Sequence, residues 1–250
     1  MNIFDFFKKK IIKEKIDTKE SLESEYLTIN KNDNIYGFQK KFYMQEERLL
    51  KVFGNANTNN IDRLKLIIIA DTHNALNEEE LINVLKLHYD YDLCILLGDH
   101  SDNDIMKILN NIPKEKIYAL LGNHDGNYIQ NYELNNLNGN MFTIKNTNIL
   151  GIEGSFKYKP VKFPSFTQEE SISFLKDLPR ADILFSHDGP FDNERVNNPA
   201  HQGLFGITYY LFKNKVKYNI HGHIHEDYNK TLLNGTKEMS LFGIHYIEID

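Results

Sequence analysis

Leu64-Lys65-Leu66-Ile67-Ile68-Ile69-Ala70 is the stretch that decides the fold, because it is a continuous apolar run of strand length. Such a run is typical of a strand that is covered on both faces in a largely parallel sheet. Outward from it, the sequence predicts further strands at 93–97, 117–121, 182–186 and 216–220, and helices at 77–89, 102–110, 167–178 and up to about 213. Strands and helices that alternate in this way predict right-handed crossovers and an α/β layer architecture.

The part of the chain before this strand has a different texture. Apolar residues between lysines predict a short amphipathic helix, whose apolar side would pack on its own domain, on a partner or on a membrane surface; these are Ile3, Phe4, Phe7, Ile11 and Ile12. Residues 35–53 fit either a strand pair or a helix, and 55–60 are typical of a linker. The predicted division is therefore an N-terminal extension, 1–62, and a main domain, 63–250.

Composition excludes several classes of protein. The net charge of the 250 residues is −6, which does not favour binding to nucleic acid. No apolar segment approaches the ~20 residues of a membrane span. The single cysteine, Cys94, lies in an apolar run and is expected to be a buried thiol. With no export signal at the N-terminus, we expect a reducing, cytoplasmic location.

Side chains that can bind metal follow each of the five apolar strands. They stand in Asp71-Thr72-His73, Gly98-Asp99-His100-Ser101-Asp102, Gly122-Asn123-His124-Asp125, Ser186-His187-Asp188 and His221-Gly222-His223-Ile224-His225. Because ligands bind at the carboxyl ends of strands in open α/β sheets, we expect the five loops to converge on one crevice. If the last strand continues through its histidines, their alternation would place all three imidazoles on one side. Oxygen and imidazole ligands without a thiolate suit Mn, Fe, Co or Zn.

The order and spacing of these motifs resemble those of the calcineurin-like metallophosphoesterase superfamily over about residues 64–250. Ser186-His187-Asp188-Gly189-Pro190 is closest in style to small bacterial phosphodiesterase members. Asn103 and Asp125 stand where the protein phosphatases of the family carry arginine and glutamate. The resemblance implies a four-layer α/β/β/α sandwich, in which two mixed sheets are flanked by helices.

The resemblance also implies a role for each motif residue. It implies one metal bound by Asp71, His73 and His225, a second bound by Asn123, His187 and His223, and Asp99 as the carboxylate that bridges both. His124 would stabilise the transition state or protonate the leaving group, and Asp102 would orient His124. His100 and His201 are candidates for substrate binding. His221 is expected to pack at the strand end, although a role as partner of a metal ligand stays open.

The function that follows is metal-dependent hydrolysis of a small phosphomonoester or phosphodiester. Hydroxide held on a dinuclear centre would attack phosphorus, with Mn expected as the metal and Fe, Zn, Co or Ni as alternatives. One alternative is a non-catalytic interaction scaffold on the same fold, which degraded ligands would indicate. Another is a nuclease, which would need a capping domain and a basic surface, whereas about 25 residues follow the fifth motif. The oligomeric state stays open.

Overall fold

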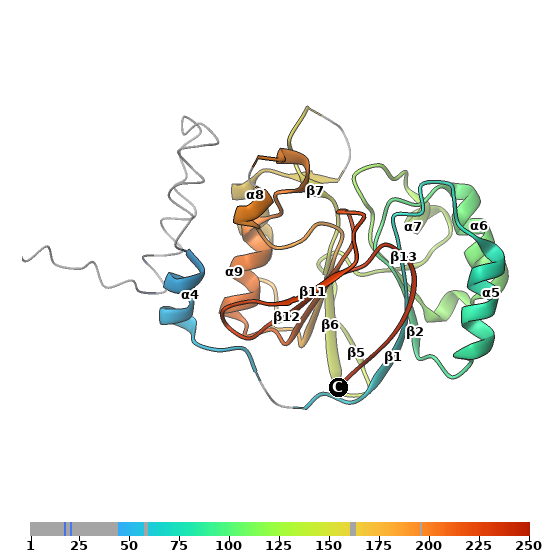
Figure 1. The fold of residues 1–250 in the computed structure, drawn as a ribbon, viewed down its shortest axis with the longest axis horizontal. Coiled ribbons are helices and arrows are strands. Elements are labelled where there is room, and N and C mark those ends of the chain that lie inside the picture. The colour runs from blue at the N-terminus through green and yellow to red at the C-terminus, as the bar shows by residue number, and fades with distance from the viewer. Residues whose placement is uncertain (1–17, 19–20, 22–44, 58–59, 161–163, 196) are drawn as a thin grey trace, which may run out of the picture.

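The computed structural model describes residues 18, 21, 45–57, 60–160, 164–195 and 197–250. The amphipathic helix predicted near the N-terminus lies outside the described residues. Two mixed sheets face each other at the centre of the molecule, and helices cover their outer faces (Figure 1). This arrangement confirms the predicted four-layer sandwich.

The first sheet has the strand order β13-β1-β2-β3-β4. Its members are β1 (Leu64–Ala70), β2 (Leu93–Leu96), β3 (Ile117–Ala119), β4 (Asn135–Asn136) and β13 (Gly243–Ile249). Strands β1 to β4 are parallel, and β13 pairs antiparallel with β1. The carboxyl ends of β1, β2 and β3 therefore lie at one edge.

The second sheet has the order β11-β12-β10-β9-β6-β5. Its members are β5 (Phe142–Ile144), β6 (Thr147–Ile152), β9 (Ile183–Ser186), β10 (Tyr218–His221), β11 (Tyr228–Thr231) and β12 (Lys237–Ser240). Strands β6, β9, β10 and β12 run parallel. Strands β11 and β12 pair antiparallel as a hairpin, with Asn234-Gly235, a dipeptide typical of hairpin turns, between them.

The helices are short. They are α4 (Gln45–Phe53), α5 (Glu78–Leu87), α6 (Asp102–Asn111), α7 (Tyr128–Asn131), α8 (Gln168–Leu175) and α9 (Phe205–Lys213), with 3-10 turns η2 (Lys114–Lys116), η3 (Asn193–Arg195) and η4 (Pro199–His201). Helix α9 is buried along almost its whole length. A capping box begins α8, where the side chains of Thr167 and Glu170 each accept the backbone N–H of the other residue. The aromatic segment after β6 forms a two-stranded parallel pair, β7 (Ser155–Phe156) and β8 (Ser165–Phe166).

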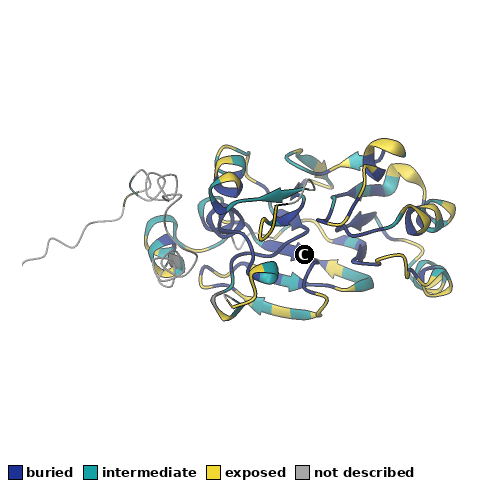
Figure 2. Cartoon of the chain, turned by 90° about the horizontal axis from the view of Figure 1, so that it is seen from above, coloured by how far each residue is buried: buried dark blue, intermediate teal, exposed yellow. Residues whose placement is uncertain are grey.

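Three hydrophobic clusters hold the layers together, and the central strands are buried while the edge strands and the outer faces of several helices are partly exposed (Figure 2). Between the sheets, Leu66 and Ile68 of β1 share a cluster with Ile220 of β10. Outside the first sheet, Ile67 and Ile69 of β1 belong to a cluster with residues of α5 and α6. Successive side chains of β1 thus pack alternately into the core between the sheets and the core under α5 and α6. Both faces of the strand are buried, and its sequence is therefore apolar throughout.

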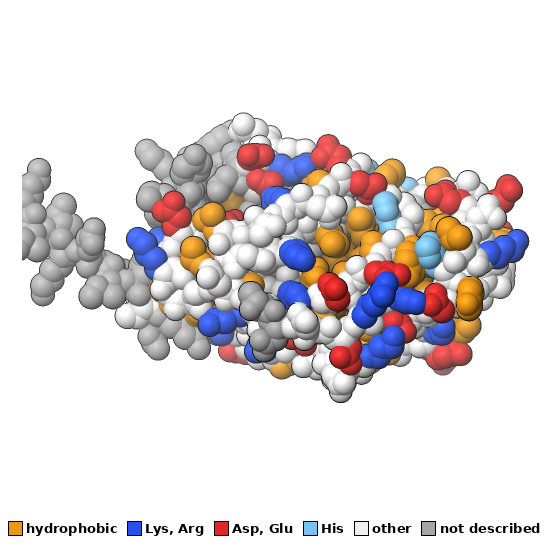
Figure 3. All heavy atoms as spheres, turned by 60° about the horizontal axis from the view of Figure 1, so that its bottom comes forward, with side chains coloured by type: hydrophobic (Ala, Val, Ile, Leu, Met, Phe, Trp, Pro, Cys, Tyr) orange, Lys and Arg blue, Asp and Glu red, His pale blue; other side chains and the backbone are white. Residues whose placement is uncertain are grey.

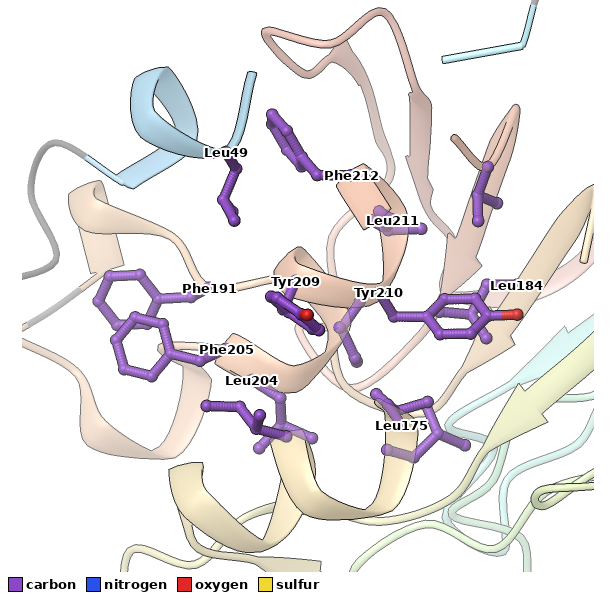
Figure 4. Packing of buried hydrophobic residues seen from close by; sticks show 14 of the residues in the cluster. Leu49, Leu175, Leu184, Phe191, Leu204, Phe205, Tyr209, Tyr210, Leu211 and Phe212 are labelled. Carbon is purple, nitrogen blue, oxygen red and sulfur yellow. The ribbon is translucent and has the colours of Figure 1, made fainter. Parts of the chain in front are cut away.

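For residues 35–53 the sequence left a strand pair and a helix as alternatives. The described part of this range is helical: it forms α4, which packs on α9. Leu49 has no exposed surface and projects toward the aromatic residues of α9 (Figure 4). Phe53 meets the Tyr209 ring edge-on, with ring centroids 5.8 Å apart. Part of the predicted extension therefore contributes to the core of the main domain.

Replacing Leu49 with alanine should lower the free energy of unfolding by about 2–5 kcal/mol, because it leaves a cavity between α4 and α9. Urea denaturation followed by circular dichroism measures the change. Lys51→Ala on the exposed side of the same helix is the matched control, with an expected change within about 0.5 kcal/mol. Equal effects of the two substitutions would show that α4 does not depend on this packing.

Candidate metal centre

The five polar loops converge at the carboxyl ends of the parallel strands, as predicted. Contacts between the two sheets show how closely they meet. His187, which follows β9 in the second sheet, donates from Nδ1 to the Leu97 carbonyl of the first sheet at 2.8 Å. The backbone N–H of His223 donates to Oδ2 of Asp71 at 2.8 Å. The crevice is therefore built from both sheets.

One group of possible metal ligands consists of Asp71, His73 and His225. The Nε2 atoms of His73 and His225 lie 3.1 Å apart, and His225 Nε2 is 3.8 Å from Asp71 Oδ1. The Asp71 side chain is buried, whereas those of His73 and His225 are 38% and 45% exposed. This group therefore opens to solvent.

The second group consists of Asp99, His187 and His223. His187 Nε2 lies 3.7 Å from Asp99 Oδ1 and 3.0 Å from Oδ1 of Asn123. The other carboxylate oxygen of Asp99 is 3.6 Å from His73 Nε2 in the first group. Asp99 thus stands between the two groups, and Asn123 adds a neutral oxygen to the second.

Two carboxylate oxygens support the assignment of these groups to cations. Asp71 Oδ1 and Asp99 Oδ2 are buried and have no hydrogen-bond partner among the described residues. Burying such an atom unpaired is costly, so nearly all buried polar atoms have partners. Burial also raises the pKa of the Asp71 carboxyl well above its usual range. Bound cations would supply the missing partners and favour the ionised carboxylates, so the donor set fits two divalent ions.

Burial favours the neutral, metal-binding form of two of the imidazoles, His187 and His225. Burial lowers the pKa of His187 to about 3, and it also lowers the pKa of His225. A neutral ring keeps a lone pair free for a cation. The bond from Nδ1 of His187 to the Leu97 carbonyl leaves Nε2 as the free nitrogen, and Nε2 of His223 lies 2.6 Å from the carbonyl of Ala200. Carbonyl partners of this kind fix the orientation and tautomer of a metal ligand.

The backbone around the site corrects the expectation from alternating histidines. Strand β10 ends at His221, and His223 and His225 have φ angles of 69° and 58°. Their placement therefore comes from a turn in the left-handed region and not from an extended strand. Asp71, His73 and Asp99 also have positive φ, so five of the seven predicted ligands adopt a conformation that non-glycine residues rarely take. Strained residues of this kind cluster at functional sites.

Asp125 ties the loops of the first sheet together, a role that the sequence did not indicate. Its carboxylate accepts the N–H groups of Asp99, His100 and Gly122 at 2.6–2.8 Å. Burial raises the pKa of Asp125 to about 7 against the effect of these donors. Asp104, also missed, accepts from the Thr72 hydroxyl and the Leu76 N–H and so holds the loop after β1 to α6.

Of the predicted site residues that are not metal ligands, some border the two groups and one does not. His124 is exposed beside the first group, with its ring centroid 5.7 Å from that of His73. His201 lies edge-on to His223, 5.1 Å between ring centroids, and so borders the second group. The structure does not bring Asp102 to His124, because Asp102 is exposed at the start of α6 and its side chain makes no hydrogen bond or ion pair among the described residues.

His100 and His221 are both in the interior. His100 is 4% exposed and its Nδ1 lies 2.8 Å from the Thr72 hydroxyl, so it is neither a substrate contact on the surface nor a solvent-facing turn residue. Burial lowers the pKa of His100 to about 4. His221 Nε2 lies 3.2 Å from Glu238, beside the Tyr228 hydroxyl. His221 thus belongs to a buried polar network at the end of β10, which packing alone does not describe.

Comparison with known proteins agrees with this geometry. The model of the calcineurin-like phosphoesterase family matches residues 64–227, and the chain belongs to that family. No curated protein matches the sequence. Among solved structures, a dimetal phosphatase from Danio rerio is 14% identical with a TM-score of 0.51, covering 72% of this chain and 87% of its own. A putative 5'-nucleotidase from Staphylococcus aureus is 15% identical with a TM-score of 0.50, covering 76% of this chain and 51% of its own.

At these identities the two structures show a shared fold. The site itself rests on the residues of this chain. Among the helices that the structure describes, none has the length and apolar character needed to cross a membrane.

Asp125→Asn should lower the free energy of unfolding by about 1–3 kcal/mol in metal-free buffer. An amide has one acceptor oxygen, so at least one of the three buried N–H groups loses its partner. Thermal or urea unfolding measures the change. Asp102→Asn removes the same charge from an exposed position and should leave stability almost unchanged; a comparable loss there would contradict the assigned role of Asp125.

Proposed function

We propose that this protein hydrolyses phosphate esters with two divalent transition-metal ions, manganese being the proposed metal, held by the groups around Asp71 and Asp99. The observation that carries the proposal is the pair of buried carboxylate oxygens without partners among the described residues, each grouped with two imidazoles. Family membership supports the reaction class. Such ions, when bound, neutralise charge on the phosphoryl group and lower the pKa of coordinated water toward ~7.

The charges of the chain leave the site attractive to anions. Asp71 and Asp99 contribute two negative charges toward the four positive charges of two divalent ions, and the other proposed ligands are neutral. Asn123 preserves this surplus because an amide binds through oxygen without adding charge. A phosphate ester would therefore bind with its oxygens toward the two groups, where Asp99 fixes the spacing between them.

His124 is the proposed proton donor to the leaving group. Its backbone N–H donates to Asp99 Oδ1 at 2.9 Å, which fixes the loop, while its side chain stays exposed at the mouth of the site. An exposed imidazole beside the metal groups can reach the leaving oxygen of a bound ester without itself being a ligand. A general acid positioned in this way typically contributes 10²–10⁴-fold to the rate.

The two alternative functions lack supporting features. A scaffold without catalysis would not require the complete set of ligands, and here all seven side chains gather in one crevice. A nuclease would favour a basic surface, whereas acidic and basic side chains intermingle on the face seen in Figure 3. The net charge of −6 also favours a small substrate over a nucleic acid.

Elemental analysis of the purified full chain, combined with turnover of mono- and bis-nitrophenyl phosphate in added Mn, tests the proposal. We expect close to two transition-metal ions per chain and metal-dependent release of nitrophenol. A chelator should remove both, and added Mn should restore them. Metal-loaded protein that releases no nitrophenol from either ester would count against the enzyme and favour the scaffold.

Asp99→Asn should reduce metal-dependent turnover to background and lower the metal content, because Asp99 contacts both groups. Asp177→Asn, an exposed carboxylate away from the crevice, is the matched control and should retain both properties. Turnover and metal content, measured on the same preparations of the wild type and both variants, test this prediction. Full activity in Asp99→Asn would rule out its bridging role.

His124→Ala should retain the metal content of the wild type but lower kcat roughly 10²–10⁴-fold, as expected for loss of a general acid. The loss should shrink for esters with better leaving groups, which need less protonation. Comparing nitrophenyl phosphate with an alkyl phosphate on both proteins measures this difference. An equal loss for both esters would assign His124 to charge stabilisation instead.

A further inference from the structure

A small cavity opens directly beside Asn123 and His124. Its volume is about 50 Å³, and its remaining walls come from the segment that carries β7 and β8: Ser155, Phe156, Tyr158, Lys159 and Ser165. Because it borders the proposed proton donor, it lies on the side of the crevice where the alcohol part of an ester would leave. Of the proposed metal ligands, only Asn123 is among the described residues that line it, and His201 is not.

The wall of this cavity is tied to the metal centre. The backbone N–H of Phe156 donates to Oδ2 of the buried Asp188 at 3.0 Å, and Asp188 directly follows His187. Strand β8 closes the other side, where the N–H of Lys157 donates to the Phe166 carbonyl at 2.8 Å. Gly154, at φ 70°, allows this approach, because a Cβ there would lie 2.2 Å from the Pro164 carbonyl oxygen. The cavity is thus held at a fixed distance from His187.

The chemistry of the lining selects a small anion. Lys159 brings the only charge among the described lining residues other than a protonatable His124, and its ammonium sits 5.0 Å from the centroid of the Tyr158 ring. Hydroxyls of Ser155 and Ser165 and the amide of Asn123 supply further polar atoms. A volume near 50 Å³ suits a small group, and the Lys159 ammonium favours an anionic one. A carboxylate meets these conditions.

Resting on the proposed function, we propose that this cavity binds a carboxylate on the alcohol part of the substrate. The substrate class is then a small phosphate ester whose leaving group carries its own negative charge. Lys159 pairs with that charge. The cavity would therefore act in specificity, and the reaction itself would proceed at the metal groups.

Two esters of matched size test the idea on the full-length, Mn-loaded protein: 2-phosphoglycolate, which carries a carboxylate, and 2-hydroxyethyl phosphate, which does not. We expect a higher kcat/KM for 2-phosphoglycolate in the wild type. In Lys159→Gln the ratio of the two kcat/KM values should fall about threefold to fivefold, the range of a solvent-exposed ion pair. Lys159→Arg should keep most of the preference because it keeps the charge.

Lys157→Gln is the matched control, because Lys157 is an exposed lysine of the same segment that does not line the cavity. Its ratio should equal that of the wild type. Equal kcat/KM values for the two esters in the wild type, or an unchanged ratio in Lys159→Gln, would overturn the inference. Continued hydrolysis of nitrophenyl phosphate in those experiments would leave the proposed function standing, whereas no hydrolysis of any ester would overturn the proposed function.

Discussion

The hydrogen bond from the His223 N–H to the Asp71 carboxylate joins the carboxyl ends of the two sheets, and the rest of the site depends on it. It holds the loop after β10 against the loop after β1, so that side chains about 150 residues apart in the chain become neighbours. Gly222 makes the approach possible, because a Cβ there would lie 2.5 Å from Asp71 Oδ2. Both possible metal groups draw members from each of the two sheets.

The close approach of the loops after β1 and β10 requires unfavourable backbone conformations, which the surrounding structure stabilises. Asp71, Asp99 and His223 hold φ angles that non-glycine residues rarely adopt, and each such residue costs of order 1–3 kcal/mol unless its neighbours enforce it. The neighbours here are rigid: three apolar clusters fix the strands, and Asp125 holds three N–H groups of the adjoining loops. The well-packed layers thus allow a small strained region at one edge of the sheets.

The α/β layers and the convergence of the polar loops could be predicted from short-range patterns in the sequence, whereas the four-layer sandwich and the division of the ligands between two metals followed from the resemblance to the family. Apolar runs mark strands buried on two faces, and polar residues after consecutive parallel strands must share one edge. The structure differs where tertiary contacts decide. The turn that places His223 and His225 depends on Asp71, the burial of His100 depends on Thr72, and the support given by Asp125 depends on loops that are distant in sequence. Nothing near Asp102 in the sequence indicated that its side chain would be exposed and away from His124.

The unequal exposure of the two groups has a consequence for how they would exchange ions with solvent. His73 and His225 are partly exposed, so an ion held there could enter and leave without movement of the fold. His187 has no exposed surface, and His223 is covered by the carbonyl of Ala200 and the ring of His201. The chain just before this cover is anchored by ion pairs of Asp192 with Lys230 and of Arg195 with Glu226. An ion at the second group would therefore be more shielded from solvent than one at the first.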